Sequence, residues 1–191
     1  MEKTPFITKE KAMEIISGHP TPFHIYDEKG IRENCRAVQE AFSWNPGFCE
    51  YFAVKATPNP YLMQIMQDYG FGFDCSSEAE LVLSDAVGAS GDKIMFSSNE
   101  TPDSEYVLAR ELGAIINLDD ITHIATLEKL FGDTFPETMS CRYNPGGTFS
   151  LGESEEGFQV MDKPGDAKYG MTEEQMIDSY KKLMAKGAKH F

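Results

Sequence analysis

The sequence predicts an α/β fold in which parallel strands alternate with helical crossovers. Short apolar runs typical of strands recur about every 20 to 25 residues, and amphipathic segments with a period near 3.6 lie between them. Of the 191 residues, 41% are hydrophobic and 12% aromatic, enough to build the core of one ordinary domain. No linker divides the alternating part, so we expect either a β/α barrel or an open sheet.

The first helix is predicted over residues 27–42, after an extended stretch at 24–26. Its apolar residues recur with helical spacing, and Asp27 is placed to cap it. A strand at 51–54 then leads through a Pro-rich turn into a helix at 61–69, which completes the first strand, turn and helix unit.

Three more units of the same kind follow. Ser77 and Glu80 have the spacing of a capping box at the start of the next helix. Pro102 suits the first turn of the helix after that, and Gly113 ends it. The predicted strands are 71–76, 93–96 and 114–118, and the helices that follow them are 77–87, 102–112 and 120–131.

A fifth strand is predicted over 138–143, before a long stretch rich in Gly and Pro that reaches residue 170. About 25 residues without a clear period is long for a connection, and loops of that length are usually functional. A last helix at 172–186 leads into residues 188–191, which have the pattern of a sixth strand beginning.

The turn after the first strand helps to distinguish the two kinds of α/β fold. Residues 55–60 (Lys-Ala-Thr-Pro-Asn-Pro) contain no glycine, which argues against the phosphate-binding fingerprint of a dinucleotide-binding sheet. An eight-stranded barrel fits the pattern but usually takes about 250 residues. Either the architecture is smaller than a barrel or the chain holds part of one, in which case we expect an open sheet edge and an apolar half-barrel.

Charge and targeting signals narrow the classes of function. The 17 Lys and Arg residues against 31 Asp and Glu residues give a net charge of −14, which argues against a nucleic-acid partner because phosphate binding needs clustered cations. No run of about 18 apolar residues predicts a membrane span, and residues 1–10 lack the apolar core of a secretory signal. The four scattered cysteines are typical of reduced thiols, so we expect a cytoplasmic protein.

Lys55 is the first candidate for chemistry. In a barrel the reactive groups lie where strands end, and strand alternation places Lys55 on one face with Tyr51 and Ala53. Loss of solvent there would favour the neutral amine, which can form a Schiff base with a carbonyl group. The alternative is a strand-terminal lysine that simply reaches water.

Asp74 and Arg142 end the second and fifth predicted strands. Asp74 could orient the lysine or bond a cofactor, or a side chain there could simply cap the next helix. A guanidinium at a buried strand end needs an anionic or aromatic partner, which makes Arg142 a better candidate than an average surface arginine. Asn99 and Asn117 also lie near strand ends, where each could bond a ligand or its own turn backbone, and we expect the turn.

Other chemistries lack their motifs. The four histidines show no metal-binding spacing, and we expect His123 to be a surface or packing residue. The sequence has no nucleophile elbow, Walker A or zincin motif. Glu153, Glu155 and Glu156 lie in the Gly-rich stretch and are expected to be solvated.

A series of motifs occurs in order along the chain: Tyr-Phe-Ala-Val-Lys-Ala-Thr-Pro-Asn-Pro at 51–60, Gly-Phe-Gly-Phe-Asp-Cys-Ser-Ser-Glu-Ala-Glu-Leu at 70–81, Phe-Ser-Ser-Asn at 96–99, Ile-Asn-Leu-Asp at 116–119, Cys-Arg-Tyr-Asn-Pro-Gly at 141–146 and Ala-Lys-Tyr-Gly-Met at 167–171. They resemble the Y-A-V-K-A-N, G-x-G-F-D-x-x-S-x-x-E-L, L-R-x-N-P-G and S-K-F-G motifs and two strand ends of the barrel-type (fold type III) amino-acid decarboxylases that depend on pyridoxal 5′-phosphate (PLP). The resemblance spans residues 24–191.

The resemblance implies a PLP-binding (β/α)8 barrel of the TIM type, with about the first five units present. It implies that Lys55 holds PLP as the internal aldimine, with Asp74 near that lysine, Arg142 near the cofactor ring and Lys168 near a homodimer interface. The motifs are most similar to those of diaminopimelate decarboxylases, which implies release of carbon dioxide from meso-diaminopimelate to give L-lysine in lysine biosynthesis. Ornithine, arginine or carboxynorspermidine as substrate, a non-catalytic homologue, and a small PLP-carrying barrel protein are the alternatives.

The sequence departs from the family pattern in two ways. Thr57 stands where the motif usually has Asn. The resemblance also implies that the phosphate-binding glycines, the acidic partner of the pyridine nitrogen and a second β-domain lie beyond Phe191, with residues 1–26 joining that domain. We therefore expect residues 1–191 alone to bind PLP poorly and to be inactive.

Overall fold

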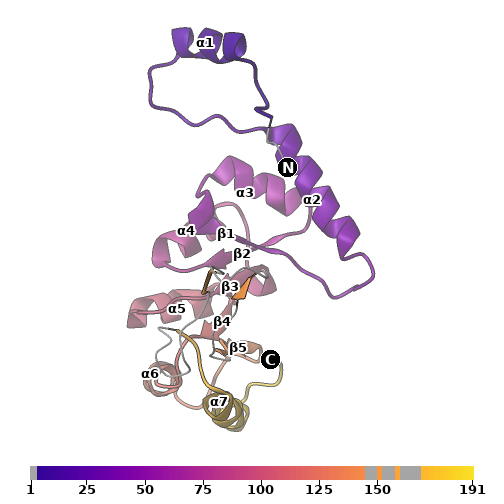
Figure 1. Ribbon diagram of the computed structural model, residues 1–191. Coiled ribbons are helices and arrows are strands. Elements are labelled where there is room, and N and C mark those ends of the chain that lie inside the picture. Colours follow the sequence, from indigo (N-terminus) through magenta and orange to yellow (C-terminus); the bar gives the residue numbers. More distant parts are fainter. Residues whose placement is uncertain (1–3, 145–149, 152–157, 160–168) are drawn as a thin grey trace. The chain divides into compact units, whose positions relative to one another are not determined.

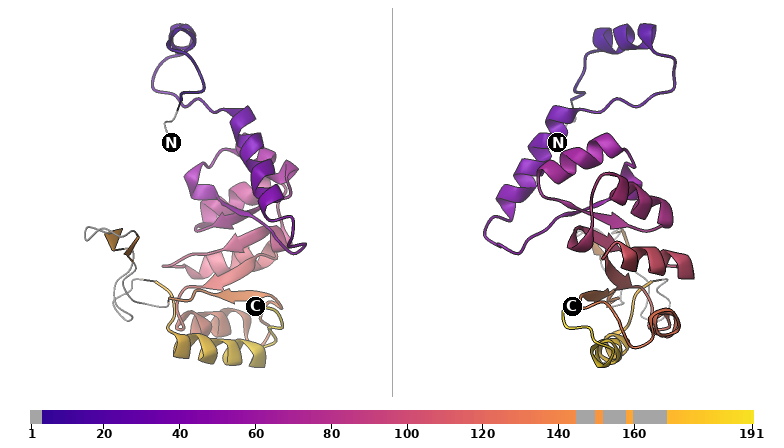
Figure 2. Two further views of the ribbon diagram at one scale, coloured as in Figure 1. Left: turned by 45° about the vertical axis from the view of Figure 1, so that its right-hand side comes forward. Right: turned by 180° about the vertical axis from the view of Figure 1, so that it is seen from behind.

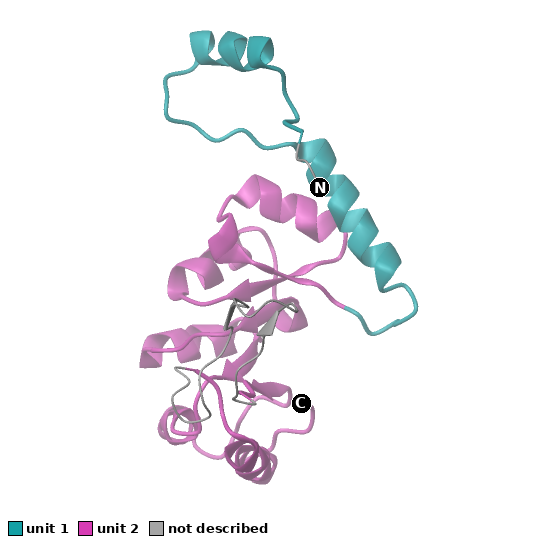
Figure 3. Cartoon of the chain, viewed as in Figure 1, with its two compact units in different colours: residues 1–48 teal, residues 49–191 magenta. Residues whose placement is uncertain are grey.

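The computed structural model describes residues 4–144, 150–151, 158–159 and 169–191 (Figure 1). The chain forms two compact units, residues 1–48 and 49–191 (Figure 3). The first unit holds helices α1 (Lys9–Gly18) and α2 (Glu28–Ala41), and α2 confirms the predicted helix, since the Asp27 carboxylate accepts a hydrogen bond from the Gly30 amide at 3.1 Å.

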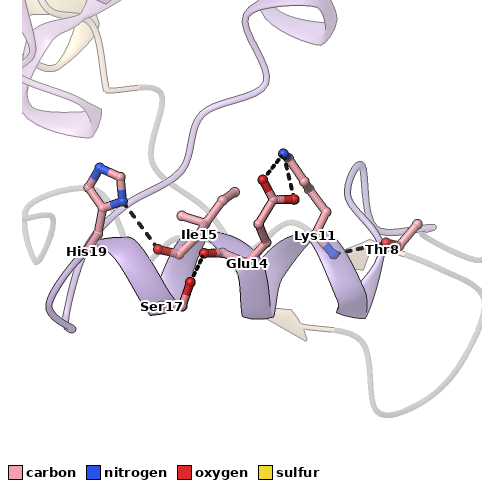
Figure 4. A network of polar contacts seen from close by, with 6 residues as sticks. All are labelled: Thr8, Lys11, Glu14, Ile15, Ser17 and His19. Atoms are coloured by element: carbon pink, nitrogen blue, oxygen red, sulfur yellow. Dashed lines mark hydrogen bonds and ion pairs between the residues drawn. The ribbon is translucent and has the colours of Figure 1, made fainter.

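Helix α1 lies where no helix was predicted, and it is held by contacts within its own sequence. Figure 4 shows the Thr8 hydroxyl accepting from the Lys11 amide at 3.2 Å, and the Lys11 ammonium paired with Glu14 at 2.9 Å. At the other end of the helix the His19 ring contacts the Ile15 carbonyl at 3.2 Å. No residue of α1 is buried, so capping and local pairing, rather than an apolar face, account for this helix.

The second unit is built on a parallel sheet of five strands in the order β1-β2-β3-β4-β5. The strands are β1 (Tyr51–Ala53), β2 (Gly72–Cys75), β3 (Ile94–Phe96), β4 (Ile115–Leu118) and β5 (Met139–Cys141). Each strand pairs with the next one along the chain, as in the pairs Ala53 with Asp74 and Leu118 with Cys141. Sequential parallel pairing confirms the predicted α/β fold and is the arrangement of successive β/α units in a barrel.

Helices join these strands at the predicted places. They are α3 (Pro60–Asp68), α4 (Glu78–Ala86), α5 (Asp103–Glu111), α6 (His123–Phe131) and α7 (Glu173–Ala185), with 3₁₀ turns η1 (Val54–Ala56) and η2 (Gly91–Lys93). Helix α6 begins three residues later than predicted because the Asp120 carboxylate accepts from the Thr122 amide at 2.8 Å and forms a turn first. Pro102 is the N-cap of α5 rather than part of its first turn.

The helices cover one face of the sheet. Contacts join α4 to β2 and β3, α5 to β4 and α7 to β5, and Figure 2 shows α4, α5 and α6 along one side of the strands. Side chains that point to this face are at most 5% exposed: Phe73, Cys75, Ile94, Phe96, Ile116, Leu118, Met139 and Cys141. The core of this unit therefore lies between the sheet and its helices.

The long stretch after β5 contains a short antiparallel strand pair, β6 (Ser150–Leu151) with β7 (Phe158–Gln159), that the sequence did not predict. Lys168 and the acidic residues Glu153, Glu155 and Glu156 lie outside the described residues. Past α7, the backbone of His190 pairs in parallel with Thr138, and its carbonyl accepts from the Met139 amide at 3.1 Å. The predicted start of a sixth strand is thus seen as a bridge at the edge of β5. None of the helices described is long and apolar enough to cross a bilayer.

Candidate cofactor site

Lys55 follows β1, but it lies in a 3₁₀ turn and not in a continued strand. The chain bends at Val54, which is fully buried, and the Thr57 amide donates to the Val54 carbonyl at 3.1 Å. The Lys55 side chain is exposed. The turn therefore places the amine at the carboxyl end of β1 in contact with solvent, without the loss of solvent that strand alternation had suggested.

Asp74 lies in β2, at a position that points away from the helices. Burial raises the pKa of Asp74, while a hydrogen bond from the Ser97 hydroxyl and the positive charge of Lys55 oppose that rise. The next helix is not capped by this carboxylate. At the start of α4 it is Glu80 that accepts from the amide of Ser76 at 2.9 Å and from its hydroxyl at 3.0 Å. Asp74 is thus available to groups at the mouth of the sheet.

Arg142 comes directly after β5, and its amide donates to the Leu118 carbonyl at 2.8 Å. Its guanidinium Nη1 donates to Asp119 Oδ1 at 3.1 Å, and its Cζ lies 5.3 Å from the centre of the Tyr169 ring. The Asp119 side chain is only 9% exposed, against 47% for Arg142. The structure therefore provides both partners, one anionic and one aromatic, that an arginine at this position requires.

Residues 169–171 are hydrogen-bonded to the segments that follow β4 and β5. The Gly170 amide donates to the Asp119 carbonyl at 3.1 Å, and the Met171 amide to the Arg142 carbonyl at 2.7 Å. The Asn144 side-chain amide donates to the Tyr169 carbonyl at 2.7 Å. Gly170 has φ of +91°, and a Cβ there would lie 2.9 Å from Asn144 Cβ. Only glycine fits this close approach, which explains its place in the Lys-Tyr-Gly-Met motif.

The three predicted residues line one cavity of about 860 Å³ at the carboxyl ends of the strands. The other lining residues are Ser76, Ser97, Ser98, Asn99, Glu100, Pro102, Glu105, Asn117 and Tyr169. Asn117 was expected to bond its own turn, but its side-chain amide donates to the Ser97 hydroxyl at 3.3 Å. Ser97 is a lining residue that sequence reasoning missed, although it lies beside a predicted strand end, and Asn117 is one whose turn contact was wrongly preferred.

This geometry suits a ligand that carries a carbonyl group. An accessible primary amine stands at the mouth, near a half-buried carboxylate and a guanidinium held in place by its own carboxylate. An amine so placed can form a Schiff base. Within residues 4–144 and 169–191, no group of three or more His, Cys, Asp or Glu side chains could hold a metal ion.

A β/α sheet with a polar cavity at the carboxyl ends of its strands defines a barrel-type domain with its site in the usual position. Comparison with known families agrees. The model of the family described as "Pyridoxal-dependent decarboxylase, pyridoxal binding domain" matches residues 28–187. The chain belongs to this family.

Curated relatives include several decarboxylases. Protein TabA of Pseudomonas amygdali pv. tabaci is 36% identical over 178 residues, which is 93% of this chain and 40% of TabA. Diaminopimelate decarboxylase of Methanothermobacter thermautotrophicus is 31% identical over 135 residues, 70% of this chain and 31% of that enzyme. The chain thus spans 40% or less of the length of these relatives.

Solved structures share the fold. Lysine decarboxylase from Selenomonas ruminantium superimposes with a TM-score of 0.76 and 17% identity, over 97% of this chain and 45% of that one. Diaminopimelate decarboxylase from Helicobacter pylori, complexed with L-lysine, gives 0.72 and 23% identity over 88% and 42% of the two chains. At these identities the likeness establishes the fold: five parallel strands alternating with helices, as in part of the barrel of PLP decarboxylases.

Proposed function

We propose that the protein is the cofactor-binding part of a PLP-dependent amino-acid decarboxylase, with Lys55 as the lysine that bonds the cofactor. The cavity that brings Lys55, Asp74 and Arg142 together carries this proposal. These residues come from the carboxyl ends of β1, β2 and β5. Family membership supports the same reading, because the matching family model describes a pyridoxal-binding domain.

The residues present fit the aldehyde and ring of PLP. Lys55 offers an accessible amine for the aldehyde, and the cavity has room for a planar ring beside Asp74 and Arg142. Among the described lining residues the cations are Lys55 and Arg142, against the acidic Asp74, Glu100 and Glu105. Three carboxylates against two cations make this lining unfavourable for a phosphate group, and barrel phosphate sites usually come from the loops after strands seven and eight. We expect the phosphate to be held outside residues 1–191.

In this proposal, the chain's own residues bind the cofactor and orient the groups around it. When bound, PLP supplies an electron sink for the electron pair that remains after carbon dioxide leaves. Lys55 forms and releases the covalent link. Asp74 offers a carboxylate beside that amine, with the Ser97 hydroxyl donating to it, and Asp119 holds the Arg142 guanidinium at the cavity wall. Asp119 thus sets the position of the Arg142 guanidinium, and Asp74 adds a negative charge that interacts electrostatically with Lys55.

For the substrate we propose meso-diaminopimelate, which gives L-lysine on decarboxylation, in a homodimeric full-length enzyme. The 31% identity to a diaminopimelate decarboxylase over 70% of this chain supports this choice. Ornithine is the second candidate, since ornithine decarboxylase of Nicotiana glutinosa is 30% identical, although over only 52% of the chain.

Borohydride trapping tests the lysine assignment. Full-length protein, including any sequence beyond residue 191, is incubated with PLP, reduced with borohydride, digested and analysed by mass spectrometry. We expect one pyridoxyl group on Lys55, lost in Lys55→Ala and kept in Lys129→Ala, whose lysine lies on α6 and pairs with Asp103. A label on another lysine in the wild-type protein would overturn the assignment.

Carbon dioxide release tests the substrate. The same full-length protein, loaded with PLP, is assayed with meso-diaminopimelate, ornithine, arginine and carboxynorspermidine at equal concentrations. We expect the highest kcat/KM for meso-diaminopimelate and no release by Lys55→Ala. A higher value for ornithine would reject the substrate and keep the reaction class, whereas no release from any amino acid would reject the reaction class.

A further inference from the structure

A second cluster of reactive side chains lies at the opposite end of the sheet from Lys55. Cys49 precedes β1, and Lys93 ends the turn η2 before β3. The Lys93 ammonium donates to the Cys49 sulfur at 3.5 Å and to the Gly70 carbonyl at 2.8 Å. The Cys49 thiol faces the same carbonyl at 4.0 Å. One backbone oxygen, just before β2, thus holds both side chains together.

Cys49 differs from the other three cysteines. Cys35, Cys75 and Cys141 are buried, and Cys49 is partly exposed. Burial raises the pKa of Cys75 to about 12 and that of Cys141 to about 11. A thiol must ionise to act as a nucleophile. Because Cys49 is the partly exposed one of the four cysteines, it is the one that a reagent in solution can reach. The Lys93 ammonium lies beside its sulfur.

Tyr51 is a further ionisable side chain close to Cys49, but it does not act as a second nucleophile. Its hydroxyl donates to the Asp92 carbonyl, and burial, with the nearby Cys49, raises its pKa to about 12. It therefore stays protonated at neutral pH. The reactive pair is left as one thiol and one amine, contributed by the segments before β1 and β3.

We propose that Cys49 and Lys93 form an acyl-acceptor site, in which Cys49 takes an acyl group from a small acyl thioester and passes it to Lys93. In the first step the Cys49 thiolate attacks the thioester carbonyl carbon. A bond forms between that carbon and Sγ, and the carrier leaves as a thiol after taking up the proton that Cys49 lost.

In the second step Lys93, having lost a proton to water, attacks the same carbonyl carbon through Nζ. The new C–N bond forms as the bond to Sγ breaks, and Cys49 leaves as a thiolate that takes up one of the two protons then on nitrogen, so the amide keeps a single N–H. The product is an amide on Lys93 and a regenerated Cys49, with no change of oxidation state. Because Lys93 Nζ and Cys49 Sγ lie 3.5 Å apart in the same chain, the transfer is intramolecular and the amine has a large effective concentration at the thioester.

Acylation changes the contacts at this end of the sheet. The amide on Lys93 has no positive charge and a single N–H, whereas the ammonium donates to both Gly70 and Cys49. The link between the segments before β2 and β3 is weakened as a result. The site lies apart from the cavity at the carboxyl ends of the strands, so the inference does not depend on the proposed function.

Site-resolved mass spectrometry tests the proposal. The purified protein is incubated with acetyl-coenzyme A as the thioester, and acetylation is followed on each lysine over time. We expect Lys93 to be acetylated about tenfold faster or more than Lys129 and Lys182, which are exposed and pair with carboxylates instead of a cysteine. Equal rates at the three lysines would overturn the proposal.

Two variants separate the steps. Cys49→Ser keeps Lys93 and is expected to reduce its acetylation to the rate of the comparison lysines. Lys93→Arg keeps the thiol and is expected to accumulate an acetyl thioester on Cys49 that hydroxylamine removes. Fast Lys93 acetylation in Cys49→Ser, or no thioester in Lys93→Arg, would reject the two-step route. Circular dichroism spectra of both variants matching the wild type show that the fold is retained.

A dialdehyde probe checks the geometry without acyl transfer. o-Phthalaldehyde links a primary amine and a thiol that lie side by side into a fluorescent isoindole. We expect fluorescence from the wild-type protein and its loss in both Cys49→Ser and Lys93→Arg. Unchanged fluorescence in the two variants would show that the thiol and the amine are not paired in solution.

Discussion

The two faces of the five-stranded sheet differ in what covers them. Toward the helices, Phe73, Phe96 and Ile116 are at most 1% exposed. On the other face, Asp74 and Met95 are partly exposed, as are Ala53, Ile115, Asn117 and Ser140. Neighbours along one strand therefore experience opposite environments.

This difference teaches which residues maintain the fold and which are available for chemistry. Burial of apolar area contributes most of the stability, so the helix side stabilises the unit. The other face, which points to the interior in a closed barrel, carries a mixture of polar and apolar side chains. The expected apolar half-barrel is found in part: Ala53, Met95 and Ile115 are apolar on this face, and Asp74, Asn117 and Ser140 are polar.

The largest expected effect comes from a matched pair on β3. Phe96→Ala removes a ring packed edge-on against Tyr106, with centroids 6.1 Å apart, and is expected to lower the free energy of unfolding by about 3 to 5 kcal/mol. Met95→Ala, one residue away on the face that points away from the helices (the open face), is expected to lower the free energy of unfolding by less than about 1 kcal/mol. Urea unfolding measures both. Similar losses in the two variants would show that the faces are not distinct.

The ion pair at the cavity mouth tests how much polar contacts add. Asp119→Asn weakens the interaction with Arg142, and because Asp119 is buried we expect a loss of about 1 kcal/mol in the free energy of unfolding. Asp103→Asn is the control, since Asp103 pairs with Lys129 at 2.9 Å on the exposed surface, where the loss should stay below about 0.5 kcal/mol. Equal losses at Asp103 and Asp119 would show that burial at the mouth has no effect.

Asp74 on the open face predicts a pH dependence. Its pKa is raised in the folded protein, so the folded state binds more protons than the unfolded state between the ordinary carboxyl pKa and the raised value. The contribution of Asp74 to stability is therefore present at acidic pH and is lost as pH rises through that window. Asp74→Asn should flatten this part of the profile and stabilise the protein at neutral pH, by less than Phe96→Ala destabilises it. Urea unfolding from acidic to neutral pH measures this, and a wild-type profile unchanged by the substitution would contradict it.

Helix α1 has no buried residue, so its stability depends on local contacts alone. Thr8→Ala removes the N-cap and is expected to cost about 1 kcal/mol of local helix stability, without shifting the urea midpoint of residues 49–191. Amide hydrogen exchange, read separately for the two units, measures this. Ser17→Ala, which removes a hydroxyl that donates to the Glu14 carbonyl inside the helix, is the matched control and should change exchange less. A shift of the urea midpoint would show that α1 also stabilises residues 49–191.

Strands β2 to β5 and helices α3 to α7 were predictable because each carries buried residues at regular spacing. Helix α7, predicted over 172–186, spans Glu173–Ala185 and begins with a capping box between Thr172 and Gln175. Helix α1 was not predicted, and its apolar residues Met13 and Ile16 are exposed, so the helix is held by local caps and pairs and not by a buried face. Strands of two residues, as in β6 and β7, are too short to show any period.

The candidate site was predictable in part. Lys55, Asp74 and Arg142 could be identified because they end predicted strands and match family motifs. Their partners could not, because Asp119 and Ser97 contact Arg142 and Asp74 from neighbouring strand ends that are distant in sequence. The exposure of Lys55 also escaped prediction, since it depends on a 3₁₀ turn that replaces one more residue of strand.

By itself, the sequence determined the alternation of strands and helices, the acidic charge and the identity of the lysine at the first strand end, because periodicity and motif spacing are local properties. Only the tertiary structure decided which carboxylate holds Arg142, why Gly170 must be glycine, and that Cys49 and Lys93 stand side by side. The physical reason is that parallel strands bring residues far apart in the chain to the same edge of the sheet, where distance and burial govern their chemistry.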